Sequence, residues 1–432
     1  MDKIVIAGGN RLSGDVKIGG SKNASLGVLA ASILNKNPVH LLNVSNVVDT
    51  SFMMNLLMNL GGRMTIDAIN LEQHNNSFGV LIVDNSSLSN DNVDYDFVSK
   101  MRASIFTLGP ILGRFGNAHI SLPGGCAIGV RPVDLYTWAL EQMGAIITLQ
   151  EGYIAATTNG KKLKGAVINF PSISNGATQC VMCAAVFAQG QTIINNASEE
   201  PEVVAVAEFL NACGAKISGF GTSTITIEGV ETLHECTYKI PSDRIEAGTY
   251  AIIAAVTNSE LRLTNCPKSI FDGCIKEFDQ IGVGVERIDD NSVRCFKSKD
   301  VFQTCNIQTA PYPGFPTDMQ AQIMSTLCLT QENAVSTITE NIFENRFMHV
   351  AELYRMGAKI SVHNNTATIY GIKKFQGANV MATDLRASVA LIIAGLVADG
   401  TTTLNRVYHL DRGYNGLVSK LKACGADINR VR

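Results

Sequence analysis

A cysteine in a glycine-rich segment is the residue best suited to chemistry in this 432-residue chain. Residues 122–135 read LPGGCAIGVRPVDL, which places Cys126 after two glycines and Arg131 five residues later. Proline and glycine disfavour regular structure here, and loops of this kind commonly carry function on a rigid scaffold. The arginine favours an anionic substrate. The alternative is a tight turn around a buried, inert cysteine.

Cations at expected helix starts are the second chemical signal. Polar residues precede apolar helical segments at 21–23, 99–102, 174–176, 242–244, 317–319 and 383–386. Simple N-capping explains most of these Ser, Thr, Asn and Asp residues. It does not explain Lys22, Arg102 or Arg386, because a cation there opposes the helix dipole by up to about 1 kcal/mol. An anion attracted by the cation and the free N–H groups would offset that cost. The pattern therefore predicts an anion-binding cleft where these helix starts meet.

The elements that must position these residues form a repeat. Six helical segments each end in a glycine that runs directly into a short strand; the glycines are Gly61, Gly144, Gly214, Gly282, Gly357 and Gly425. Glycine after an apolar periodic run is typical of a helix C-terminus. The six glycines lie between 68 and 83 residues apart, which is too long for a solenoid repeat. Two lobes of three units each fit the length better.

A second, apolar helix precedes each of these segments. The six predicted helices are rich in Ala, Ser and Gly and cover 24–34, 102–112, 177–188, 246–256, 319–329 and 386–396. Each is followed by a short strand pattern. Helices of such small residues can pack closely, so we expect them to be buried.

Composition narrows the class of protein. The chain is 46% apolar and 17% charged, with a net charge of −3. This balance gives no general attraction to nucleic acid or to an anionic membrane, so we expect neither partner. The start of the chain lacks an apolar signal core, no run approaches the length of a membrane helix, and the eleven cysteines are scattered, so we expect a cytoplasmic location. Cys180 and Cys183 are predicted to pack in the core, and His349 to be structural.

Long motifs resemble one known family. They are GSKN (20–23), MRAS (101–104), the Cys126 segment, PYPGFPTDMQAQ (311–322), ENRFMHV (344–350), ATDLRAS (382–388) and YHLDRGY (408–414). Together they resemble the UDP-N-acetylglucosamine 1-carboxyvinyltransferase family, the enolpyruvyl transferases that open peptidoglycan synthesis. The resemblance runs from end to end. It implies an α/β fold, the two-lobed inside-out α/β barrel of six βαβαββ units. One lobe would be residues 22–241 and the other 1–21 with 242–432, with the active site in the cleft between them.

The resemblance also implies an activity. The family transfers the enolpyruvyl group of phosphoenolpyruvate to the 3-hydroxyl of UDP-N-acetylglucosamine and releases phosphate. The alkene carbon must gain a proton while the hydroxyl loses one, so a donor and a base are needed. Cys126 matches the family's proton donor and Asp318 its base. Plain N-capping of the helix at Met319 is the other interpretation of Asp318.

The family's binding residues can be carried over by position. Those for phosphoenolpyruvate match Lys22, Arg131 and Arg412, with Asp384 and Arg386 beside them. Those for the UDP-sugar match Asn23, Arg102, Arg131, Pro132, Val133, Asp134, Leu135, Ser172, Ile173, Ser174, Asn175 and Ile342. Arg346 is either part of this site or a solvated surface charge. Gly27, Tyr136 and Asn175 depart from the family's common pattern. We expect no metal, no cofactor and no obligate protein partner.

Other functions compete with this one. The acceptor could be shikimate 3-phosphate or another nucleotide sugar, or the chain could be an inactive UDP-sugar-binding regulatory paralogue. The LPGGC and RPVD motifs argue against shikimate 3-phosphate. The presence of Cys126, Asp318 and Lys22 argues against an inactive regulator.

Overall fold

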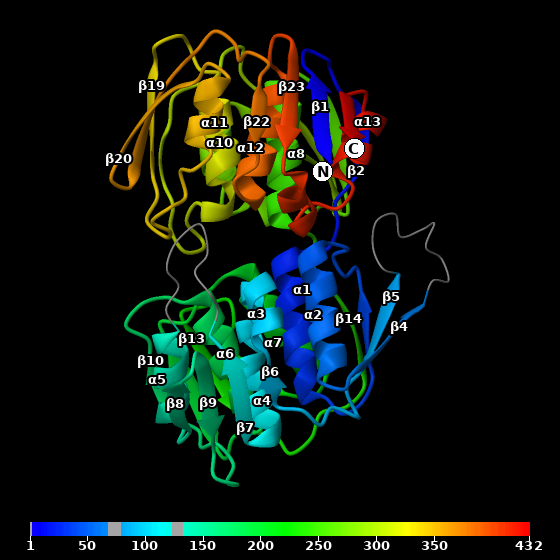
Figure 1. Ribbon diagram of the computed structural model, residues 1–432, viewed down its shortest axis with the longest axis vertical. Helices are drawn as coiled ribbons and strands as arrows, with labels where there is room; N and C mark the ends of the chain where they lie inside the picture. The colour runs from blue at the N-terminus through cyan, green and yellow to red at the C-terminus, as the bar shows by residue number, and fades with distance from the viewer. Residues whose placement is uncertain (1, 68–78, 123–132) are drawn as a thin grey trace. The chain divides into compact units, whose positions relative to one another are not determined.

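The computed structural model describes residues 2–67, 79–122 and 133–432 (Figure 1). Contacts divide the described chain into two compact units, with boundaries between Gly19 and Gly20 and between Pro241 and Ser242. We call residues 2–19 with 242–432 the Asp318 unit, and the described residues of 20–241 the Lys22 unit. Each unit has its own apolar core.

The Asp318 unit contains three four-stranded sheets among its described residues. The first has the order β22-β23-β1-β24 (Asn379–Met381, Thr401–Asn405, Lys3–Ala7, Asp427–Val431). The second is β2-β15-β17-β16 (Ser13–Lys17, Glu260–Thr264, Ser292–Lys297, Val283–Asp289). The third is β18-β19-β21-β20 (Asn306–Gln308, Val335–Thr339, Thr366–Tyr370, Lys359–His363).

The described part of the Lys22 unit also contains three four-stranded sheets. They are β14-β3-β5-β4 (Cys236–Lys239, Val39–Leu42, Val80–Asp84, Arg63–Asp67), β6-β7-β9-β8 (Asn92–Val93, Asn117–Ser121, Tyr153–Thr157, Ile146–Gln150) and β10-β11-β13-β12 (Val167–Asn169, Gln191–Asn195, Thr224–Glu228, Lys216–Ser218). In all six sheets the first two strands pair in parallel and the other two pairings are antiparallel. This shared order confirms the predicted six-fold repeat.

One helix in each repeat is mostly buried. In the Lys22 unit these helices are α1 (Lys22–Ala31), α4 (Leu108–Phe115) and α6 (Asn175–Ala185); in the Asp318 unit they are α8 (Arg244–Val256), α10 (Gln320–Leu327) and α12 (Leu385–Leu396). The last three pack against one another. Small residues permit such packing: a Cβ on Gly109 of α4 would lie 2.1 Å from the carbonyl oxygen of Cys180 in α6. The strands around them alternate buried and exposed residues, as in sheets with one solvated face.

The second helix of each repeat ends as the sequence predicts. These helices are α2 (Val48–Asn59), α5 (Asp134–Gln142), α7 (Pro201–Ala212), α9 (Ile275–Ile281), α11 (Val350–Arg355) and α13 (Leu417–Ala423). All six glycines of the repeat have φ between 89° and 111°. Because only glycine adopts this conformation without strain, the repeat reflects a backbone requirement.

One predicted helix start is wrong. Residues 99–102 do not begin a helix, because α3 (Tyr95–Lys100) ends there and the 3₁₀ segment η3 (Arg102–Thr107) leads into α4. The helix expected from Met319 is present as α10, which begins at Gln320 after the 3₁₀ turn η5 (Thr317–Met319). Three further 3₁₀ segments are η1 (Ser32–Leu34), η4 (Lys268–Phe271) and η6 (Val407–Arg412). None of the helices in the described ranges is long and apolar enough to cross a membrane.

Candidate active site

Two buried arginines hold the carboxylate of Asp318. Its Oδ1 accepts a hydrogen bond from Nη2 of Arg346 at 2.7 Å, and its Oδ2 accepts one from Nη2 of Arg386 at 2.5 Å. The arginine side chains are 5% and 8% exposed, whereas that of Asp318 is 24% exposed. The two arginines therefore fix the orientation of the carboxylate, while part of the Asp318 side chain stays accessible to solvent. The burial of Arg346 excludes the interpretation, left open by the sequence, that this residue is a solvated surface charge.

Asp318 is not an N-cap, which corrects one of its two interpretations. Pro316 holds the N-cap position of η5 and Met319 that of α10, and neither start has a side-chain cap among the described residues. Asp384 does cap its helix, since its Oδ1 accepts from the backbone N–H groups of Arg386 at 2.7 Å and Ala387 at 3.0 Å. Asp384 therefore caps a helix, whereas Asp318 accepts hydrogen bonds from two arginines.

The electrostatics of this cluster keep Arg386 charged. Burial acts to lower the pKa of Arg386, but Asp318, through its charge and its hydrogen bond, together with Tyr414 and Asp243 outweighs burial and raises that pKa above its ordinary value. A buried guanidinium next to a carboxylate stabilises the ionised form of both groups. The cluster can therefore present an ionised, fixed carboxylate to a ligand.

The hydroxyl of Tyr414 links the starts of three buried helices. It lies 3.4 Å from Nη1 of Arg386 in α12, 3.3 Å from Nε2 of Gln322 in α10 and 2.9 Å from Oγ1 of Thr249 in α8. The first two groups can only donate, so the Tyr414 proton must go to Thr249. Thr249 in turn donates to the carbonyl oxygen of Ile245 at 2.7 Å. Tyr414 thereby positions Arg386, which holds Asp318.

Tyr414→Phe is expected to lower the free energy of unfolding by about 1 kcal/mol, because it removes hydrogen bonds from a buried network. Denaturant unfolding measures this loss. The matched control is Tyr250→Phe, since the hydroxyl of Tyr250 is buried and has no hydrogen-bond partner among the described residues. That change should be neutral or stabilising. Equal losses in both variants would contradict the role assigned to Tyr414.

Glu340 connects Ile342, a predicted substrate contact, to the 3₁₀ turn η5 that contains Asp318. Its Oε2 accepts from the hydroxyl of Thr317 at 2.9 Å, and its Oε1 accepts from the backbone N–H of Ile342 at 2.8 Å. The hydroxyl of Thr309 also donates to Oε1, at 2.9 Å. Glu340 is 3% exposed. Glu340 was not among the residues predicted from the sequence, although an acid directly after strand β19, whose residues alternate between buried and more exposed positions, was a visible signal. Arg412, another predicted contact, ends η6 two residues before Tyr414.

Lys22 in the other unit also lies beside a carboxylate. It is the first residue of α1, which Ser21 caps by accepting from the backbone N–H of Ala24 at 3.2 Å. Nζ of Lys22 is 3.4 Å from Oδ2 of Asp49, and the two side chains are 13% and 5% exposed. The Asp49 carboxylate therefore offsets part of the charge of Lys22 at this helix start, and the anion-binding cleft stays a prediction. Asn23 follows as the second residue of α1.

Gly27, Tyr136 and Asn175 depart from the family's common pattern, and each has a close neighbour in helix α6. Oδ1 of Asn175 accepts from Nε2 of Gln179 at 2.5 Å. A Cβ on Gly27 would lie 2.4 Å from Oε1 of the same Gln179, so glycine at this position gives Gln179 its space. A Cβ on Gly176 would lie 1.7 Å from the hydroxyl oxygen of Tyr136. Gly27 and Gly176 therefore accommodate Gln179 and Tyr136.

The remaining predicted residues of this unit flank helix starts. Ser172 and Ile173 are exposed, and Ser174 caps α6 by accepting from the backbone N–H of Ala177 at 3.3 Å. Val133 and Leu135 are half-buried on either side of exposed Asp134, where α5 begins. Arg102 opens η3. Cys126, Arg131 and Pro132 lie outside the described residues.

His349 makes stability depend on pH. The side chain is buried, with Nε2 3.2 Å from Sδ of Met324, and burial lowers its pKa to about 4. Between about pH 6.5 and 4 the unfolded chain binds a proton that the native His349 does not. The free energy of unfolding should therefore fall by about 1.4 kcal/mol per pH unit as pH drops through this window. Unfolding curves from pH 7 to 5 measure it. His349→Gln should lose this slope, and an unchanged slope would be the contrary result.

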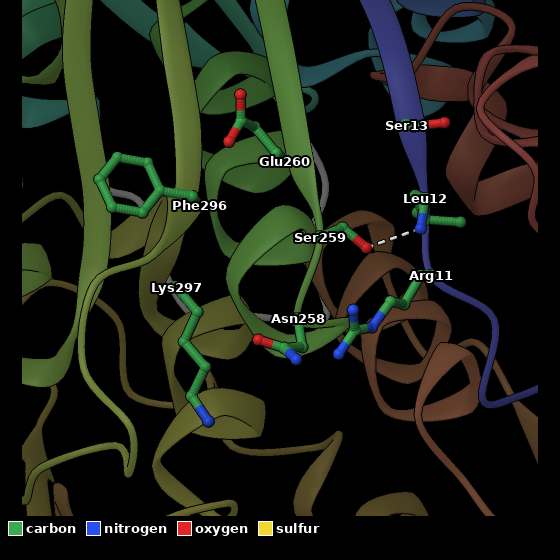
Figure 2. A pocket seen from close by; sticks show the side chains of 8 residues that line it. All are labelled: Arg11, Leu12, Ser13, Asn258, Ser259, Glu260, Phe296 and Lys297. Carbon is green, nitrogen blue, oxygen red and sulfur yellow. Dashed lines mark hydrogen bonds between the residues drawn. The ribbon is translucent and has the colours of Figure 1, made fainter.

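Titratable residues of the described ranges form no metal-binding cluster. A pocket in the Asp318 unit is lined by Arg11, Leu12, Ser13, Asn258, Ser259, Glu260, Phe296 and Lys297. Figure 2 shows these side chains, with Oγ of Ser259 accepting from the backbone N–H of Leu12 at 2.6 Å. No predicted site residue lines this pocket, so it is distinct from the Asp318 cluster.

Comparison with known proteins gives matches over the whole chain. The sequence model of EPSP synthase (3-phosphoshikimate 1-carboxyvinyltransferase) matches residues 6–421. UDP-N-acetylglucosamine 1-carboxyvinyltransferase of Paramagnetospirillum magneticum is 48% identical over 434 residues, which are 100% of this chain and 99% of that protein. The protein of the same name from Rickettsia bellii is 48% identical over 431 residues and all of both chains.

Solved structures share the fold. The enolpyruvyl transferase NikO from Streptomyces tendae has a TM-score of 0.88 at 24% identity, over 100% of this chain and 99% of its own. EPSP synthase from Acinetobacter baumannii has a TM-score of 0.74 at 17% identity over 100% of both chains. These similarities confirm the predicted fold class, the inside-out α/β barrel. The chain belongs to the EPSP synthase family and, within it, to the UDP-N-acetylglucosamine 1-carboxyvinyltransferases, which are transferase enzymes.

Proposed function

We propose that this chain transfers the enolpyruvyl group of phosphoenolpyruvate to the 3-hydroxyl of UDP-N-acetylglucosamine, with release of phosphate, in peptidoglycan synthesis. The observation that carries the proposal is 48% identity over the whole chain to proteins named for this reaction. The buried arginine pair around Asp318 supports it, because a fixed, ionised carboxylate is what deprotonation of a hydroxyl requires.

In this reaction Asp318 takes the proton of the sugar hydroxyl and Cys126 donates a proton to the alkene carbon. The side of the Asp318 carboxylate that solvent can reach is available to the hydroxyl, while Arg346 and Arg386 fix the other side. Two guanidiniums make the carboxylate a weak base in the resting protein. Proton transfer is therefore coupled to attack of the sugar oxygen on the enolpyruvyl carbon, because the hydroxyl becomes a much stronger acid as that bond forms.

The charges of phosphoenolpyruvate require several cations. We assign its phosphate and carboxylate to Lys22, Arg131 and Arg412, with Arg386 and Asp384 beside them. The UDP-sugar contacts are the residues carried over from the family at 23, 102, 131–135, 172–175 and 342. We assign one lobe of the enzyme to residues 22–241 and the other to residues 1–21 with 242–432. The enzyme acts in the cytoplasm, without a cofactor or an obligate protein partner.

Product analysis tests the proposal. Incubation with phosphoenolpyruvate and UDP-N-acetylglucosamine should give a product whose mass is the sum of the substrates less phosphoric acid, with a vinyl ether at the 3-oxygen by NMR. A vinyl ether at another oxygen would contradict the assigned acceptor group. No product, with both substrates bound, would favour the inactive regulatory paralogue.

A further inference from the structure

Two cysteines of the Lys22 unit lie in direct contact, far apart in sequence. Cys213 is the C-cap residue of α7 and Cys236 is the first residue of β14. Their Sγ atoms are 2.8 Å apart. A disulfide bond has an S–S distance of about 2.05 Å, so less than about 1 Å of approach separates the thiols from a bond.

The backbone around the pair is held by hydrogen bonds of its own. The N–H of His234 donates to the carbonyl oxygen of Cys213 at 2.9 Å. Nδ2 of Asn35 donates to the carbonyl oxygen of His234 at 2.7 Å. Nδ2 of Asn37 donates to that of Leu233 at 2.8 Å. The two segments are therefore fixed next to each other before any sulfur chemistry takes place.

The two residues differ in exposure, and their thiols differ in acidity. Cys213 is fully buried, whereas Cys236 is 9% exposed. The hydrogen bond from the Cys213 thiol lowers the pKa of Cys236, and donating it raises the pKa of Cys213. Burial instead raises the pKa values of Cys180, Cys183 and Cys328. Because the thiolate is the reactive form, Cys236 is the member of the pair that an oxidant meets first.

We propose that Cys213 and Cys236 form a redox modification site that a peroxide converts into a reversible disulfide. In the first step the Cys236 thiolate attacks one peroxide oxygen, which gives a sulfenic acid and releases hydroxide. In the second, the Cys213 sulfur attacks the Cys236 sulfur, the S–O bond breaks, and water leaves with the Cys213 proton. Two thiols and one hydrogen peroxide thus yield one disulfide and two waters. The bond ties the C-terminal end of α7 to β14.

Peptide mapping of the full chain tests the site. Reduced protein carrying Cys126→Ser, which removes the proposed catalytic thiol, is treated with equimolar hydrogen peroxide, alkylated and digested. The expected product is a cross-linked peptide pair containing residues 213 and 236, two hydrogens lighter than the free peptides and separated by dithiothreitol. The oxidised protein should unfold at a higher temperature than the reduced one, because the bond restricts the unfolded chain.

Variants establish the order of the steps. Cys213→Ser should stop at the sulfenic acid, so that dimedone labels Cys236. Cys236→Ser should leave Cys213 reduced, and Cys180→Ser, the matched control, should still form the cross-link. A folded protein in which other cysteines oxidise while this pair stays reduced would overturn the proposal. A linked protein that unfolds at a lower temperature would also overturn it, because it would show that the native positions do not suit the bond. None of these measurements depends on the proposed transferase activity.

Discussion

Asp318→Asn is expected to lower kcat by roughly 100-fold or more while both substrates still bind, the range typical for loss of a general base. The amide cannot take the hydroxyl proton. It also turns an NH₂ group toward one of the two guanidiniums that now donate to the carboxylate. One arginine contact is therefore lost as well, and the loss of the base must be separated from the loss of this contact.

Comparing the change in kcat with the change in KM separates the loss of the base from the loss of the arginine contact. If Asp318 only positioned Arg346 and Arg386, Asp318→Asn would mainly raise the KM for the anionic substrate and leave kcat within a few-fold. Asp243→Asn is the matched control, because Asp243 caps buried α8 of the same unit by accepting from the N–H groups of Ile245 and Glu246. Asparagine caps about as well as aspartate, so this control should stay near wild type. Near-wild-type kcat in Asp318→Asn would give the base role to Asp384 or to water.

Cys126→Ser should lose most activity, on the order of 100- to 10,000-fold, because a hydroxyl is a far poorer acid than a thiol. Cys126→Asp should retain part of the activity, since a carboxyl group can still donate a proton. Steady-state phosphate release with each variant measures both effects. Activity of Cys126→Ser close to wild type would remove Cys126 from the proton-donor role.

Alkylation by fosfomycin, an epoxide analogue of phosphoenolpyruvate, provides an independent check on Cys126. The other ten of the eleven cysteines are buried. Peptide mapping should therefore place the adduct on Cys126. The closest rival is Cys236, whose pKa the neighbouring Cys213 thiol lowers. An adduct at Cys236 or any other position would contradict the assignment.

The repeat could be predicted from the sequence because its signals are local. Each glycine after an amphipathic helix marks a backbone conformation that other residues adopt only with strain, and all six glycines adopt it. The start of α4 was not predictable in the same way. Residues 95–100 form a short helix of their own, and the chain passes through a 3₁₀ segment before α4 begins. Such boundaries depend on packing that local patterns do not contain.

The candidate site was predictable only in part, for a similar reason. Capping by Ser21, Ser174, Asp243 and Asp384 follows from residue type, and the structure places all four as caps. The roles of Arg346 and Glu340 depend on contacts across 28 and 23 residues of sequence. The cations at helix starts predict an anion-binding cleft, and that cleft stays a prediction. What the sequence could not indicate was that Asp49 and Asp318 lie beside Lys22 and Arg386.

Phosphate release with a panel of acceptors tests the central claim most directly. The wild-type chain should release phosphate from phosphoenolpyruvate only when UDP-N-acetylglucosamine is present, with one phosphate released for each acceptor consumed. Shikimate 3-phosphate and other nucleotide sugars should support little or no release. Equal or faster turnover with any of those acceptors would contradict the proposed function, whatever the behaviour of the individual variants.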